Sequence, residues 1–83
     1  MNITDKSLAL FLAYARDAGN WNGNPLVGGN VGGSKEDRGN LTQLKQAGLL
    51  TTEKDWEDRS LAWVSFTDAG RALAASHGVT IQN

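Results

Sequence analysis

Between positions 35 and 46 the chain carries three cations, a threonine and two glutamines at spacings that suit one side of a helix. At about 100° per residue, Lys35, Thr42, Gln43 and Gln46 point away from the leucines of the same segment, and Arg38 lies on a flank. Glutamine can bond an adenine edge twice, threonine can contact a thymine methyl or a phosphate, and Lys and Arg bind phosphates. This pattern favours contact with duplex DNA.

A second candidate surface lies between positions 50 and 66. Lys54 and Arg59 could clamp a sugar-phosphate backbone, but four acids in the same stretch outnumber them. Such an acidic surface favours a protein partner over DNA, and tryptophan is enriched at binding hot spots. The alternative protein interface consists of Trp56, Trp63, Glu57 and Asp58. A plainer interpretation, in which the two indoles only cover a small hairpin, stays open.

Two observations oppose DNA contact. Glu36 lies near the candidate face at the N-terminal end of its helix, which is the end that a recognition helix normally places deepest in the major groove. Eight Lys and Arg against nine Asp and Glu give a formal net charge of −1, whereas dedicated nucleic-acid binders usually have a basic excess. A solvated polar face is therefore the alternative to a DNA-reading face.

Three capped helices are expected to position these side chains. Thr4, Ser34 and Thr67 each offer the hydroxyl of an N-cap residue. Ser34 and Asp37 have the spacing of a capping box, in which Asp37 reaches back to the Ser34 amide. The expected helices span residues 5–17, 34–47 and 68–77, and glycines 19, 48 and 78 lie close to their ends.

The first helix has an apolar stripe that predicts its buried side. Leu8, Phe11, Leu12 and Ala15 follow the i, i+3, i+4, i+7 rule, so we expect them to face the core. Tyr14 lies off this stripe. Tyr14 is therefore not among the residues expected to face the core.

A β-hairpin is expected over residues 50–66. Two runs rich in β-branched and aromatic residues, 50–56 and 61–66, flank a polar turn. Period-two alternation puts Ala62, Val64 and Phe66 on one face, and the nearness of Phe66 to the last helix makes this the core face.

The interval 19–33 is rich in glycine and asparagine and has two interpretations. A short helix could begin with Asn24 as cap and Pro25 at its first position. Interior glycines cost a helix about 1 kcal/mol each relative to alanine. The alternative is an ordered loop held by Trp21 and neighbouring apolar residues.

The run of residues from 41 to 73 resembles the C-terminal half of a winged helix-turn-helix domain. The resemblance rests on the leucines three apart before Gly48-Leu49-Leu50, on Trp63-Val64-Ser65-Phe66-Thr67 and on Gly70-Arg71-Ala72-Leu73. It implies a single α+β domain over residues 1–83, with three helices, the second short or loop-like, and a two-stranded β-hairpin wing. It further implies a small DNA-binding regulator with helix 34–47 in the major groove and hairpin 50–66 as the wing. The alternative is a winged-helix interaction module or inhibitor that binds a protein through its acidic, Trp-bearing wing and glycine-rich loop.

Other classes of function have little support in the sequence. No cysteine is present, no apolar run approaches the roughly 18 residues of a membrane span, and the only histidine is His77. We therefore expect a cytoplasmic protein that is not an enzyme and has no cofactor, metal site or membrane partner. Winged helices often read paired half-sites, so a homodimer stays open.

Overall fold

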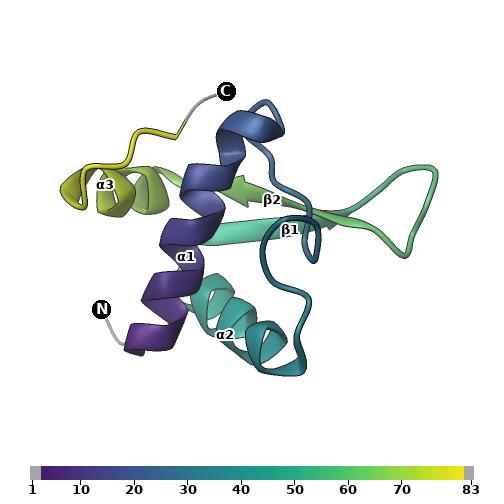
Figure 1. The fold of residues 1–83 in the computed structure, drawn as a ribbon, viewed down its shortest axis with the longest axis horizontal. Helices are drawn as coiled ribbons and strands as arrows, with labels where there is room; N and C mark the ends of the chain where they lie inside the picture. The colour runs from purple at the N-terminus through teal and green to yellow at the C-terminus, as the bar shows by residue number, and fades with distance from the viewer. Residues whose placement is uncertain (1–2, 82–83) are drawn as a thin grey trace.

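The computed structural model describes residues 3–81 and shows a small α+β domain (Figure 1). Within these residues three α-helices accompany one two-stranded antiparallel hairpin. The elements in chain order are α1 (Asp5–Asp17), the 3₁₀ turn η1 (Ala18–Asn20), α2 (Lys35–Gln46), β1 (Leu50–Lys54), β2 (Ala62–Phe66) and α3 (Asp68–Ser76). The three expected helices and the hairpin are confirmed.

The helices begin where the capping residues predict. The side-chain oxygens of Thr4, Ser34 and Thr67 accept hydrogen bonds from backbone N–H groups three residues further on, which satisfies one otherwise free donor of each helix. After α2, Gly48 adopts a φ of 75°, a left-handed conformation that glycine reaches without steric cost. Local sequence therefore sets the start of all three helices and the end of α2, whereas α1 continues through Ala18 into η1.

The hairpin meets α1 on its expected face. β1 pairs with β2 in the register Leu50↔Phe66, and Val64 is fully buried. Phe66 is half-buried and packs edge-on against Phe11 of α1, with ring centroids 5.9 Å apart. Figure 1 shows α1 crossing the strands, with α2 below them and the turn between β1 and β2 projecting away from the helices.

The buried side of α1 differs from the expected stripe. Ser7, Leu10 and Tyr14 are buried, whereas Leu8 and Leu12 are only half-buried. Phe11 and Ala15 of the expected stripe are buried as predicted, but the core face is rotated toward Leu10 and Tyr14, so the placement of Tyr14 off the core face is wrong. Polar groups can enter the core when they are hydrogen-bonded, and every buried side-chain N or O atom in residues 3–81 has a partner.

Residues 21–33 form an ordered loop, here called the glycine-rich loop, and no helix begins at Asn24. Pro25 instead accepts a hydrogen bond from Val64 N–H at 2.8 Å, and Val27 N–H donates to Ala62 O at 2.8 Å. This short stretch thus runs along the free edge of β2. Gly32 covers the Tyr14 hydroxyl so closely that a Cβ at this position would overlap it.

The glycine-rich loop is tied to α1 by one buried carboxylate. Asp17 is 6% exposed and accepts hydrogen bonds from Asn20 Nδ2, Trp21 Nε1 and Asn30 Nδ2 at 2.8–3.0 Å. Burial alone would raise the pKa of Asp17, but these three hydrogen bonds outweigh it and lower the pKa.

No helix in residues 3–81 has the length and apolar character needed to cross a bilayer.

Candidate functional site

The exposed side of α2 holds most of the side chains that the sequence singles out. Lys35, Arg38, Thr42 and Gln46 are all exposed, and Lys45 is exposed beside them. Gly39 lies among them, and a Cβ built there would meet nothing within 4 Å. We call these six residues the cationic face of α2.

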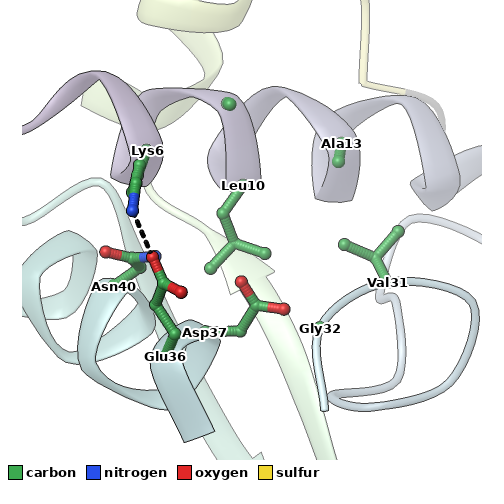
Figure 2. Close-up of a pocket in the computed structure, with 9 residues that line it drawn as sticks. Lys6, Leu10, Ala13, Val31, Gly32, Glu36, Asp37 and Asn40 are labelled. Carbon is green, nitrogen blue, oxygen red and sulfur yellow. Dashed lines mark hydrogen bonds and ion pairs between the residues drawn. The ribbon is translucent and has the colours of Figure 1, made fainter. Parts of the chain in front are cut away.

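The first acid of α2 is turned toward α1. Glu36 Oε1 accepts a hydrogen bond from Lys6 Nζ at 2.7 Å, as Figure 2 shows. The hydrogen bond from Lys6 and then its positive charge lower the pKa of Glu36, and the same contact raises the pKa of Lys6. The objection that Glu36 would face DNA is thereby weakened, because its carboxylate is paired on the side of α2 next to α1.

The second acid of α2 also points away from the cationic face. Asp37 is half-buried and its carboxylate is directed between Leu10 of α1 and Gly32 of the loop (Figure 2). The three cations of the cationic face consequently have no acid of α2 among them. In residues 3–81 the Lys6–Glu36 pair is the one salt bridge, so Lys35, Arg38 and Lys45 are not neutralised by an ion pair.

Gln43 has a structural role that the sequence does not reveal. Its Oε1 accepts a hydrogen bond from Thr4 N–H at 2.8 Å, and the side chain is half-buried. Gln43 is only partly exposed, because its Oε1 ties α2 to the start of α1. A contact across 39 residues leaves no local signal in the sequence.

Thr42 keeps only part of its expected capacity to contact DNA through hydrogen bonds. Its hydroxyl donates to the Arg38 carbonyl at 3.0 Å, a common use of a helical threonine. The methyl group and the acceptor lone pairs remain for a ligand. Gln46 is exposed, which leaves it as the amide side chain of α2 that is best placed to contact a base.

The acids of the hairpin turn stabilise the turn itself. Asp55 accepts hydrogen bonds from Trp63 Nε1 at 2.9 Å and from the backbone N–H groups of Glu57 and Asp58 at 3.0 Å. Asp58 accepts from the hydroxyl and the N–H of Ser60. The bond from Trp63 and then those from the two amides lower the pKa of Asp55, and the bonds from Ser60 lower that of Asp58.

The cations and tryptophans of the hairpin are placed very differently from one another. Lys54 and Arg59 are exposed at the end of the hairpin that projects away from the helices (Figure 1). Trp63 is half-buried and packs edge-on against Trp21 of the glycine-rich loop, with ring centroids 5.5 Å apart. Trp56 is 88% exposed. Of the two hairpin tryptophans, only Trp56 therefore presents its indole to solvent, beside exposed Glu57 and Asp58.

Within residues 3–81 no group of three His, Asp or Glu side chains is arranged to hold a metal ion. His77 is the C-cap residue of α3. Comparisons with models of protein families, with curated proteins and with solved structures gave no match to this chain. Its own residues therefore carry the argument for function.

Proposed function

We propose that this protein binds duplex DNA through the cationic face of α2, as a small regulatory protein of winged-helix type. The observation that carries the proposal is the distribution of charge on α2. Both acids of the helix are turned toward α1, and Lys35, Arg38 and Lys45 are left exposed without an ion pair. A net charge of −1 for the whole chain conceals this local positive surface.

Each residue of the cationic face has a role in the proposed complex. An α-helix fits the major groove of B-DNA, where the three cations bind phosphates and set the register. Gln46 and the Thr42 methyl contact base edges. Gly39, which has no side chain, lets the helix axis approach the bases closely.

The winged-helix assignment has support and one departure from the family pattern. The order α2, β1, β2, α3 supports it, as does the stretch of residues 25–27 along the edge of β2. In residues 21–33 there is no helix to form a helix-turn-helix pair with α2. α1 supports α2 instead, through the bonds Lys6–Glu36, Thr4–Gln43 and Ser7–Asn40.

In this scheme the hairpin lies beside the DNA backbone, where Lys54 and Arg59 contact phosphates. Duplex DNA as the partner implies an intracellular protein, and the cytoplasm is the location we propose. A single domain of this size covers few base pairs, so a homodimer on paired half-sites is the natural assembly for sequence-specific binding.

Fluorescence anisotropy of a labelled random duplex, titrated at several salt concentrations, tests the proposal. Binding is expected to weaken linearly with the logarithm of salt concentration, and Arg38→Ala is expected to reduce the slope by about 1, the contribution of one phosphate contact. Arg16→Ala is the matched control, since Arg16 is an exposed cation in the last turn of α1 and should leave the slope unchanged.

Two results would contradict the proposal. One is the absence of binding at low salt. The other is an equal reduction of the slope by Arg38→Ala and Arg16→Ala, which would show that DNA responds to total charge and not to the cationic face.

A second candidate function rests on Trp56. The indole is 88% exposed on a turn that five hydrogen bonds to Asp55 and Asp58 hold in place. A rigid, exposed tryptophan flanked by acids suits a protein partner with an apolar pocket and a basic rim. Affinity capture with wild-type and Trp56→Ala baits tests this role: a partner retained equally by both baits would argue against it.

A further inference from the structure

A groove of about 420 Å³ lies between α1, the glycine-rich loop and the first turns of α2. α1 contributes Ala9, Leu10 and Ala13 to its lining, and the loop contributes Val31. Figure 2 shows the side chains of Leu10 and Val31 pointing into the space between the two helices and the loop. The groove therefore has an apolar floor and walls from three segments far apart in the sequence.

Asp37 brings an unpaired carboxylate into this groove. Its backbone N–H donates to Ser34 Oγ at 3.0 Å, but its carboxylate does not return the bond that a capping box would contain. No hydrogen bond or ion pair to this carboxylate exists in residues 3–81. The expected capping box is thus only half formed, and the acid points between Leu10 and Gly32 (Figure 2).

The other side-chain oxygen atoms and the one cation around the groove take part in polar contacts. Lys6 and Glu36 form their ion pair at one end, and Asn40 Oδ1 accepts a hydrogen bond from Ser7 Oγ at 3.2 Å. The lining therefore holds one cation and two carboxylates, and the carboxylate without a partner is that of Asp37. An anionic ligand would meet this negative charge at close range.

We propose that the groove binds a small primary ammonium compound with a short aliphatic group. The ammonium donates hydrogen bonds to the Asp37 carboxylate, and the aliphatic part packs on Leu10, Ala13 and Val31. A volume of this size matches a small molecule. Glu36 is paired with Lys6 and Asn40 Oδ1 with Ser7, so the Asp37 carboxylate alone offers free oxygen ligands, too few for Ca²⁺ or Mg²⁺.

This site is independent of the proposed DNA contact. The groove lies on the side of α2 next to α1, whereas the cationic face is exposed to solvent. A ligand in the groove and DNA on the cationic face can be bound at the same time. Failure of either proposal leaves the other intact.

An NMR titration of ¹⁵N-labelled protein with n-butylammonium tests the inference. Saturating shifts are expected at the amides of Leu10, Ala13 and Val31, with a Kd on the order of 1 mM for so small a ligand. n-Butanol has the same shape without the charge, and butyrate has the opposite charge. Both are expected to bind at least about tenfold more weakly, because a charged hydrogen bond is lost.

Two variants locate the site. Asp37→Asn keeps the backbone bond to Ser34 and is expected to weaken butylammonium binding about tenfold. Asp68→Asn, which removes an exposed acid from the first turn of α3, is the matched control and should leave binding unchanged. Ala13→Leu, which narrows the groove without changing its charge, is a second test and should abolish the shifts.

Four outcomes would overturn the inference. The first three are equal binding of butanol and butylammonium, unchanged butylammonium binding by the Asp37→Asn variant, and shifts centred on the acidic hairpin turn. Tighter binding of an Nα-acetyl-lysine amide, which keeps its side-chain ammonium, than of butylammonium would also overturn the inference. That result would assign the groove to a lysine of another protein. Chemical shifts of the free variants establish that each is folded.

Discussion

The glycine-rich loop and the hairpin turn are anchored in the same chemical way but at different depths. In each, an aspartate accepts a hydrogen bond from an indole N–H: Asp17 from Trp21 at 2.8 Å, and Asp55 from Trp63 at 2.9 Å. Asp17 is buried and also accepts a hydrogen bond from Asn30, which lies 13 residues away in the sequence. The other donors to Asp55 lie within three residues of it. Asp17 thus holds tertiary structure, whereas Asp55 holds mainly a local turn.

This difference shows that hydrogen bonds of the same chemical type can contribute unequally to the stability of the fold. Asp17 joins α1 to Trp21 and Asn30 of the glycine-rich loop, so its loss breaks tertiary bonds, whereas the exposed backbone N–H groups that bond to Asp55 can turn to water. Global stability should therefore depend on Asp17 far more than on Asp55.

The largest expected effect comes from Asp17→Ala. It removes the acceptor of three side-chain donors, so we expect the free energy of unfolding to fall by about 3 kcal/mol, measured by urea denaturation. Asp5→Ala is the control, because this acid in the first turn of α1 interacts chiefly with the helix dipole and should cost less than about 1 kcal/mol. Equal losses in the two variants would refute the comparison.

The next largest effect should come from lowering the pH, which weakens the hydrogen bonds between Asp17 and the glycine-rich loop. The pKa of Asp17 is lower in the folded protein than in the unfolded chain, so its contribution is fully present above the unfolded value of about 4 and is lost as the pH falls through the folded pKa. The Tm is expected to fall from pH 5 to pH 2. Asp17→Asn should show a shallower fall, although Asp55 and Asp58, whose pKa values are also lowered, leave part of it in place.

The contact between Trp21 and Trp63, which joins the glycine-rich loop to the hairpin, should have an intermediate effect on stability. Trp21 and Trp63 pack at an interplanar angle of 64°, so a double-mutant cycle with Trp21→Ala and Trp63→Ala should give a coupling energy of about 1 kcal/mol. A coupling near zero would mean that the loop and the hairpin are stabilised independently.

The smallest expected effect is that of Asp55→Ala. Its two backbone donors are exposed and can bind water, and only the half-buried Trp63 indole loses a tertiary partner, so we expect the Tm to fall by less than about 4 °C. Hydrogen exchange should accelerate at the amides of Glu57 and Asp58 and stay unchanged at Val64 in the core. Faster exchange at Val64 would show that the turn is coupled to global stability.

The sequence predicts the secondary structure of this protein well because its signals are local. Hydroxyl caps at Thr4, Ser34 and Thr67 and the glycine after α2 define the helices within a few residues of each boundary. The burial of Val64 follows from strand alternation together with the nearness of Phe66 to the last helix. These features need no knowledge of distant parts of the chain.

The sequence could not predict contacts in which polar groups satisfy one another over long distances. Tyr14 enters the core because the glycine-rich loop closes over it, and Gln43 turns toward α1 because Thr4 offers an N–H. The pairing of Glu36 with Lys6, 30 residues away, likewise decides which charges α2 shows to solvent. The composition of the cationic face was visible in the sequence, but its freedom from acids was not.

The edge-to-face pair of Trp21 and Trp63 also gives the protein a built-in optical signal. Two indoles with centroids 5.5 Å apart are close enough for their electronic transitions to couple, and the coupling exists only while the glycine-rich loop rests on the hairpin. An exciton band in circular dichroism should therefore report undocking of this loop separately from loss of helix. Time-resolved spectra could then show whether the loop joins the sheet before or after the helices form.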